Sequence, residues 1–108
     1  MTSRVFFEPI KVLAFGGISG AYASVGTPTT HRVRCICISN DTEGDLYITT
    51  NTAQDEIFVK AGSFRLYDLQ SNINPQFDDS FVLEIGTQFS AKQVTAPVSG
   101  AVYIECIY

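Results

Sequence analysis

Short runs of alternating apolar and polar residues fill most of this chain, and such runs predict β-strands. Three of them follow one another closely, LYITT at residues 46–50, EIFVK at 56–60 and SFRLY at 63–67. All three are rich in β-branched and aromatic residues, which fit a pleated, half-buried surface. Turn-forming residues separate them, Asn51 and Asp55 in the first gap and Gly62 in the second. The sequence therefore predicts three consecutive strands at the centre of the chain.

The alternation also assigns side chains to faces. In the third of these strands Phe64 and Leu66 point one way, and Arg65 and Tyr67 point the other way. The strongest single strand signal is HRVRCICIS at residues 31–39, where both faces become apolar in the second half. Two apolar faces are typical of a central strand in a two-layer stack.

A turn is expected directly after this strand, at NDTEGD, residues 40–45. Its Asn and Asp side chains can bond their own backbone, and its glycine tolerates unusual dihedral angles. The remaining strand candidates are RVFFE at 4–8, IKVLAF at 10–15, FVLEI at 81–85, QFSAKQV at 88–94 and AVYIECIY at 101–108. In the run at 81–85 we expect Phe81, Leu83 and Ile85 to point inward.

About eight short strands at this spacing, with no convincing amphipathic helix, predict an all-β fold. We expect one domain over residues 1–108, a two-layer antiparallel β-sandwich of the jelly-roll or Greek-key type. A small up-and-down barrel is the alternative.

The segment GGISGAYASVGTPTT at residues 16–30 is a long uncharged loop or arm. Loops of this length inside a compact domain are uncommon and are often functional. It is either a surface loop packed by Ile18, Tyr22 and Val25, or an arm that orders on a neighbouring subunit.

Composition narrows the choice of partners. The chain of 108 residues carries a net charge of −4 and has no cluster of Lys and Arg, so we expect no nucleic-acid binding through phosphates. No apolar run approaches the roughly 20 residues that a membrane-spanning helix needs. Glu8, Pro9 and Lys11 interrupt the apolar N-terminal stretch, which therefore does not resemble a signal peptide.

The three cysteines are expected to be reduced thiols. Cys35 and Cys37 are two residues apart in one strand, so they point to the same face about 6.5–7 Å apart, too far for a good disulfide. Small buried thiols behave as apolar side chains.

Two groups of residues have the ligand types of a metal site without its spacing. The first group consists of His31, Cys35, Cys37 and Cys106. It has the ligand count of a zinc site but lacks the Cys-x-x-Cys pattern. The second is the acidic turn at 41–45, but Thr52 stands where a calcium-binding EF-hand places its bidentate Glu. We therefore expect no metal site.

Candidate catalytic residues are few. His31 is the only histidine, so a Ser-His-Asp or Cys-His relay would have to use it. The carboxylates that could form a glycosidase pair fall in polar loops or on outward strand positions, and they are Asp68, Asp78, Asp79 and Glu84. We expect no enzymatic activity and no cofactor; a small hydrolase would require His31 to lie in a cleft beside an acid.

The aromatic residues are more suggestive, because tyrosine is enriched at protein interfaces and its ring can carry a sugar. The candidate interface residues are Ile18, Tyr22, Val25, Tyr47, Tyr67 and Tyr103. For each tyrosine, ordinary packing with the hydroxyl group at the rim is the alternative.

A combination of short motifs resembles a known class of proteins. The motifs are ISN at 38–40 with the acidic turn that follows, LYIT at 46–49, IFVKAGS at 57–63, LYDL at 66–69, FVLEIGTQ at 81–88 and SGAVYI at 99–104. Together they resemble the small virion structural proteins of tailed bacteriophages, over about two thirds of the chain.

In those proteins a β-sandwich of this size serves as a capsid decoration (cement) subunit or a head–tail connection subunit. The resemblance implies a non-enzymatic structural protein of the virion, most specifically a capsid decoration protein, assembled in the host bacterial cytoplasm. The implied partners are a second or third copy of the chain, as a homodimer or homotrimer, and the major capsid protein or other virion proteins. A neck or tail subunit is the alternative within this class, and a carbohydrate-binding β-sandwich module is the alternative outside it.

Overall fold

The computed structural model describes residues 6–51, 54–69 and 83–108. Within them the chain forms eight strands and one short 3-10 helix, η1 (Phe15–Gly17). The strands are β1 (Lys11–Ala14), β2 (Ala23–Ser24), β3 (Cys35–Thr42), β4 (Leu46–Thr50), β5 (Ile57–Val59), β6 (Phe64–Asp68), β7 (Phe89–Gln93) and β8 (Gly100–Ile107). The described residues contain no helix that could cross a membrane.

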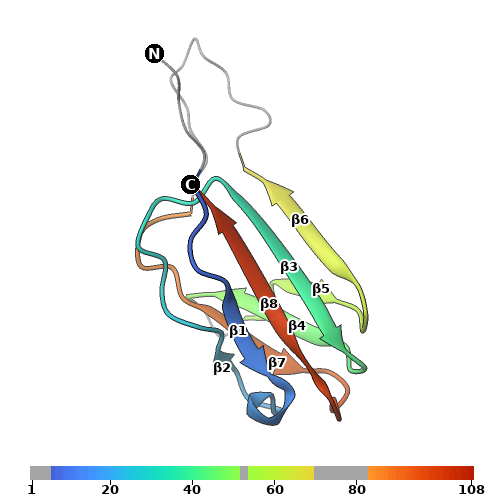
Figure 1. The fold of residues 1–108 in the computed structure, drawn as a ribbon. Helices are drawn as coiled ribbons and strands as arrows, with labels where there is room; N and C mark the ends of the chain where they lie inside the picture. Colours follow the sequence, from blue (N-terminus) through green and yellow to red (C-terminus); the bar gives the residue numbers. More distant parts are fainter. Residues whose placement is uncertain (1–5, 52–53, 70–82) are drawn as a thin grey trace, which may run out of the picture.

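The strands form two antiparallel sheets (Figure 1). The first sheet has the order β1-β8-β3-β6, and the second sheet, which lies behind it, has the order β2-β7-β4-β5. β1 pairs with β8, β2 with β7, β3 with β6 and β4 with β5, so the chain runs as a double-stranded ribbon folded on itself. This is the jelly-roll topology, and it confirms the predicted all-β, two-layer sandwich.

The core lies between the two sheets and follows the strand alternation. Ile36 and Ile38 on β3 and Val102 and Ile104 on β8 point inward from the first sheet. The second sheet contributes Leu46, Ile48, Val59, Phe89 and Ala91. β3 is central in its sheet, as its two apolar faces predicted.

The predicted turn at residues 40–45 is confirmed only for residues 43–45, because β3 continues through Asn40 and Asp41 to Thr42. Asn40 is buried, and its side-chain amide donates to main-chain oxygens of Gly44 and Val59. A polar residue can stay inside a strand when the interior satisfies its hydrogen bonds. The sequence pattern indicates only the turn propensity of Asn40. It does not reveal that Gly44 and Val59 will accept its hydrogen bonds.

Two other predicted strands are reduced to single bridges in the described residues. The run at 4–8 contributes only the pair of Phe7 with Ile107. From Phe7 to Lys11 the chain advances four residues while its partner advances three, from Ile107 to Ile104, so a bulge lies around Pro9. Bulges and prolines are typical of sheet edges.

The predicted strand at 81–85 is represented by the pair of Leu83 with Val33. Leu83 is half-buried and packs against the core, as predicted. Ile85 is exposed, so the prediction that it points inward is wrong. Phe81 lies outside the described residues.

Residues 16–30 pack along the sandwich. Ile18 and Val25 are buried in the core, and β2, which the sequence did not predict, pairs with β7. This arrangement is the packed surface loop that was one of the two interpretations of the segment.

Candidate interaction surface

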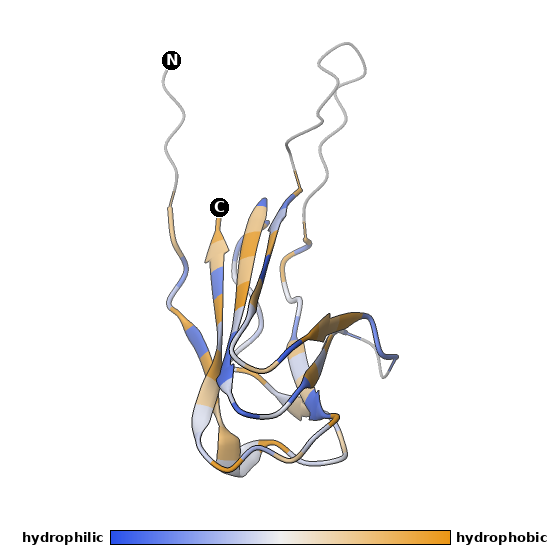
Figure 2. Ribbon diagram, turned by 90° about the vertical axis from the view of Figure 1, so that its right-hand side faces the viewer, coloured by the Kyte–Doolittle hydropathy of each residue, from blue (hydrophilic) through white to orange (hydrophobic). Residues whose placement is uncertain are grey.

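The first sheet has an outer face, formed by the side chains that point away from the second sheet. The strand register places Val12, Tyr103, Ser39 and Phe64 directly opposite one another, in one row across all four strands. Leu66 and Cys37 form part of the neighbouring row. Figure 2 shows the second sheet on one side of the first, so this outer face carries no layer of the described chain.

Large apolar side chains are exposed over this outer face. Phe64 is 64% exposed and Leu66 is 61% exposed, although both belong to a regular strand. Val12 and Ile10 at the opposite edge of the sheet are exposed as well. Apolar groups that are contiguous rather than scattered mark surfaces that bind a partner.

The charged residues at the outward strand positions are all acidic. They are Asp41 on β3, Asp68 on β6 and Glu105 on β8, and each is exposed. Arg65, the one basic residue of β6, belongs to the opposite face, where its Nε donates to the main-chain oxygen of Phe58. Exposed apolar side chains and three carboxylates therefore share the outer face, and Glu105, opposite Cys37, lies on an inner strand of the sheet.

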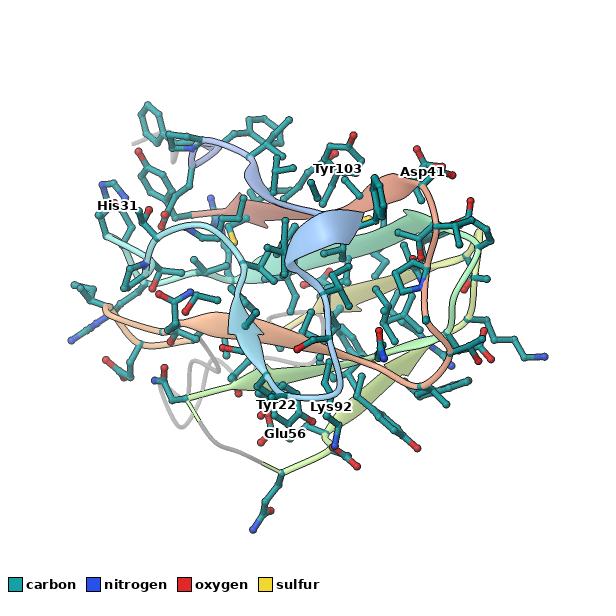
Figure 3. All side chains as sticks on the ribbon, turned by 90° about the horizontal axis from the view of Figure 1, so that it is seen from below. Tyr22, His31, Asp41, Glu56, Lys92 and Tyr103 are labelled. Atoms are coloured by element: carbon teal, nitrogen blue, oxygen red, sulfur yellow. The ribbon has the colours of Figure 1, made fainter. Side chains whose placement is uncertain are left out.

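The second sheet presents a different outer face. Lys92 lies over the rings of Tyr22 and Tyr47, with its Nζ 4.9 Å and 5.5 Å from the two ring centroids. The same Nζ lies 2.8 Å from Asp55, which also accepts a hydrogen bond from the Tyr22 hydroxyl. Figure 3 shows Tyr22 and Lys92 together at the opposite side of the molecule from Tyr103. The polar groups of Tyr22, Asp55 and Lys92 are therefore partners of one another.

This cluster has a clear electrostatic signature. The bonds from Lys92 and then Tyr22 hold the pKa of Asp55 below its usual range. Desolvation, followed by the bond to Asp55, raises the pKa of Tyr22. The ring of Tyr22 is thus held as a neutral phenol beside an ionised carboxylate, which is a stable structural arrangement.

The structure distributes the candidate interface residues over several places. Tyr103 lies on the outer face of the first sheet, and Tyr22 and Tyr47 lie together on that of the second. Tyr67 points to the inner side of β6. The side chains of Ile18 and Val25 belong to the core and are not offered at the surface of the single chain.

Sequence reasoning did not single out the exposed apolar members of the outer face, Phe64, Leu66, Ile10 and Val12. The alternation of β6 did predict that Phe64 and Leu66 share a face. The signal that could have singled them out is that this short run is apolar on both faces, as Leu66 and Tyr67 show. A strand of that kind needs cover on two sides, and the sandwich supplies one layer only.

His31 does lie beside an acid. Its Nδ1 is 3.6 Å from Oε2 of Glu8 and 3.1 Å from Oγ1 of Thr30. Its ring stacks on Tyr108, with centroids 3.6 Å apart and planes 4° from parallel. In a nucleophilic relay the acid and the nucleophile contact different ring nitrogens. Here both approach Nδ1, so the group does not have the geometry of a catalytic triad.

A cavity of about 420 Å³ adjoins this group, between β1 and the loop before β3. Glu8, Lys11, Thr27 and Thr30 line it, and His31 is not among its lining residues. Lys11 donates to the main-chain oxygen of Thr27 at 2.8 Å and lies 3.6 Å from Glu8. The charges on its wall are thus used within the protein, as a buried pair requires.

The cysteines are free thiols on two faces of the first sheet. Cys35 and Cys37 are half-buried on the outer side, and Cys106 is buried on the inner side opposite Ile36. Burial raises the pKa of Cys106 to about 11. In the described residues no group of three or more His, Cys, Asp or Glu side chains is placed to hold a metal ion.

Comparisons of the chain with protein-family models, with curated proteins and with solved structures found no match. The outer face of the first sheet is therefore the feature from which a function can be inferred.

Proposed function

We propose that this protein is a non-enzymatic structural subunit that binds a larger assembly through the outer face of its first sheet. The observation that carries the proposal is the exposure of large apolar side chains on that face, Ile10 and Val12 at one edge and Phe64 and Leu66 at the other. A buried core forms under the same sheet, so the exposed residues are not needed to fold the chain. Covering them in an assembly would bury further apolar area at about 25 cal/mol per Å².

The specific form of the proposal is a bacteriophage capsid decoration protein. It rests on the sequence resemblance to small virion structural proteins, whose implied partners are other copies of the chain and the major capsid protein. Jelly rolls are also common in viral capsid proteins, which is an analogy at the level of fold. A neck or tail subunit would use the same surface. Binding to heads or to necks and tails distinguishes a decoration protein from such a subunit.

The outer face indicates the chemistry of its partner surface. Its most exposed apolar residues lie at its two edges, and Asp41, Asp68 and Glu105 are its charged residues. A complementary surface would carry apolar residues together with Lys or Arg placed to meet these carboxylates, because opposed charges favour correct docking and like charges oppose it. The net charge of −4 acts in the same direction.

The test is binding to phage heads. The protein is co-expressed with the major capsid protein of the same genome, and the particles are separated on a density gradient. We expect the wild-type chain to co-sediment with heads and Val12→Lys to remain at the top, because the lysine places a positive charge in an apolar contact with a basic partner surface. Ser24→Lys on β2 is the matched control, since Ser24 is exposed on the second sheet and should leave binding intact.

Two outcomes would overturn the proposal. One is a wild-type chain that stays unbound in the presence of intact heads, necks and tails. The other is a Val12→Lys chain that binds as tightly as the wild type. Binding to purified necks or tails in place of heads would support the alternative within the same class.

The carbohydrate-binding alternative would use Tyr22 and Tyr47 on the second sheet. Lys92 lies over both rings, and Asp55 anchors Lys92 there. A sugar would have to displace this lysine to stack on either ring, so the structure favours the outer face of the first sheet. A glycan array with the wild-type chain checks this order of preference.

A further inference from the structure

β6 is the longest edge strand of the described chain. The edges are β1 and β6 in the first sheet and β2 and β5 in the second. β6 has five residues, against four, two and three in β1, β2 and β5. All five residues of β6 are exposed. An exposed, unbroken and apolar edge is a template for pairing with another strand.

The backbone of β6 alternates between its two neighbours, as in any antiparallel strand. The main-chain oxygen of Ser63 accepts from Asn40, and the N–H of Leu69 donates to Arg34, so odd-numbered positions bond to β3. The even-numbered Phe64 and Leu66 therefore direct their N–H and C=O groups to the open edge. No strand of the described chain pairs with that edge, which is the right-hand edge of the front sheet in Figure 1.

The other long edge is protected. β1 follows the bulge around Pro9, and the loop at Gly26 lies directly against it. A Cβ added to Gly26 would be 2.8 Å from Cβ of Lys11 and 3.1 Å from its Cα, so the loop lies in close contact with β1 at Lys11. Bulges, prolines and covering loops are the usual protection of an edge, whereas β6 has a continuous register and neither proline nor glycine.

We propose that two copies of this chain pair through β6, antiparallel and with Leu66 opposite Leu66 of the second copy. A two-fold axis perpendicular to the sheet at Leu66 generates this arrangement. It uses the open N–H and C=O groups of Leu66 in two reciprocal hydrogen bonds and those of Phe64 at both ends of the pairing. The occupant of the open edge is thus a second copy of the same strand.

The side chains of β6 are complementary to themselves in this register. Leu66 meets Leu66 on the outer face, and Phe64 meets Asp68 of the second copy. On the other face Arg65 meets Tyr67 of the second copy, twice, and a guanidinium beside an aromatic ring is favourable. No two like charges are directly opposite, which is the condition for a stable cross-strand pair.

The pairing joins two four-stranded sheets into one continuous sheet with both outer faces on the same side. The exposed Phe64 and Leu66 of the two copies then form one apolar surface across the two-fold axis. The pairing itself depends only on β6, whereas the use of the doubled surface for binding rests on the proposed function. A strand contact of five residues is small, so we expect a reversible, concentration-dependent dimer.

A charge exchange at the two-fold axis tests the pairing. Sedimentation equilibrium of the wild-type chain should show a monomer–dimer equilibrium. Leu66→Lys alone and Leu66→Glu alone should each dimerise roughly tenfold more weakly, because each places like charges opposite each other. An equimolar mixture of the two variants should regain the dimer, which occurs only when position 66 faces itself. Leu66 is exposed, so both variants should fold.

The matched control applies the same exchange to Val12→Lys and Val12→Glu, on the outer face at the other edge. Neither should change dimerisation if the contact is the β6 edge, and both should change it if outer faces stack. Amide exchange followed by NMR gives the register. The N–H groups of Phe64 and Leu66 should become protected as the concentration rises, while those of Arg65 and Tyr67 are protected throughout.

A wild-type chain that is monomeric at millimolar concentration would overturn the pairing, as would a dimer that the position 66 exchange leaves unchanged. Either result leaves the head-binding test of the proposed function untouched. Conversely, a dimer with the predicted exchange pattern and no binding to phage particles would refute the proposed function alone.

Discussion

The side chain of Asn40 on β3 donates a hydrogen bond to the main-chain oxygen of Val59 on β5, 3.1 Å away. The two strands belong to different sheets, so this bond joins the layers of the sandwich. The same amide donates to oxygens of Gly44 at 2.8 Å and Lys60 at 3.2 Å, and its oxygen accepts from the N–H of Thr42 at 3.1 Å. A buried amide so fully bonded fixes one layer relative to the other.

We predict that Asn40→Ala destabilises the protein by about 3 kcal/mol, because it leaves several buried polar groups without partners. Asn40→Asp should be at least as damaging at neutral pH, since it turns a carboxylate oxygen towards three carbonyl oxygens. Urea denaturation followed by circular dichroism measures the change. Ser39→Ala, one residue earlier on the opposite face of β3, is the control and should change stability by less than about 0.5 kcal/mol.

The alternation of apolar residues predicted β4 at its observed bounds and the sharing of faces along β6. It could not predict which face of the first sheet lacks a second layer. Periodicity states which side chains point together, whereas cover depends on where each strand lies in its sheet. Phe64 and Leu66 are exposed because β6 is an edge strand of that sheet and their face points away from the second sheet.

Local sequence patterns also could not predict contacts between segments that are distant in the chain. Asn40 has the propensity of a turn residue, yet it stays in a strand. The main-chain oxygens of Val59 on β5 and of Gly44 in the loop after β3 accept the hydrogen bonds of its side chain. Glu8 meets His31 because the chain before β1 is paired with the end of β8, and the loop before β3 passes beside it. Tertiary context overrides local propensity in both cases.

The second prediction concerns the stability of a variant at Gly100, which lies against the main chain of Asp41. Gly100 begins β8 with a φ of +87°, and an added Cβ would lie 1.8 Å from the main-chain oxygen of Asp41. The clash involves backbone that is held in the sheet, so it cannot be relieved by a side-chain rotation. Gly100→Ala should therefore destabilise by about 3 kcal/mol from backbone strain and overpacking together. Thermal unfolding checks the value.

Gly62 supplies the matched control for that experiment. It has a φ of +70°, but nothing lies within 4 Å of an added Cβ. Gly62→Ala should lose only the preference of glycine for this backbone region, about 1 kcal/mol. Equal losses at the two positions would contradict the contact with Asp41.

The third prediction concerns the pH dependence of stability, to which Glu43 contributes. Glu43 accepts hydrogen bonds from the N–H groups of Val98 and Ser99, each at 2.8 Å, and from the Ser99 hydroxyl. The Ser99 side-chain bond, followed by the main-chain bonds, lowers the pKa of Glu43 to about 2. Because the folded pKa lies below the unfolded one, the stabilisation is complete above about pH 4.5 and is lost as the pH falls towards 2.

We expect the melting temperature to fall across this range and Glu43→Gln to flatten the dependence. Scanning fluorimetry from pH 2 to 6 measures both. Glu105→Gln, which removes an exposed carboxylate of the same type on β8, controls for the change in net charge. A Glu43→Gln profile parallel to that of the wild type would show that the bonds to Val98 and Ser99 contribute nothing.

The buried pair of Glu8 and Lys11 gives the last prediction. Both side chains are at most 4% exposed, and Nζ of Lys11 lies 3.6 Å from Oε1 of Glu8. Glu8 also accepts from the N–H groups of Thr30 and His31, at 3.3 Å and 3.2 Å. Glu8 therefore holds the loop before β3 against β1, and Lys11 compensates its charge.

Removing one partner of such a pair leaves an uncompensated buried charge, at a loss of about 3–5 kcal/mol. We expect Lys11→Met and Glu8→Gln each to destabilise by roughly that amount. The double variant should be more stable than the sum of the two losses implies, by about 1–3 kcal/mol, because it buries no net charge. A double-mutant cycle in urea measures this coupling. Additive losses would mean that the two charges do not interact, and the contact of β1 with the loop would then depend on the Thr30 and His31 bonds alone.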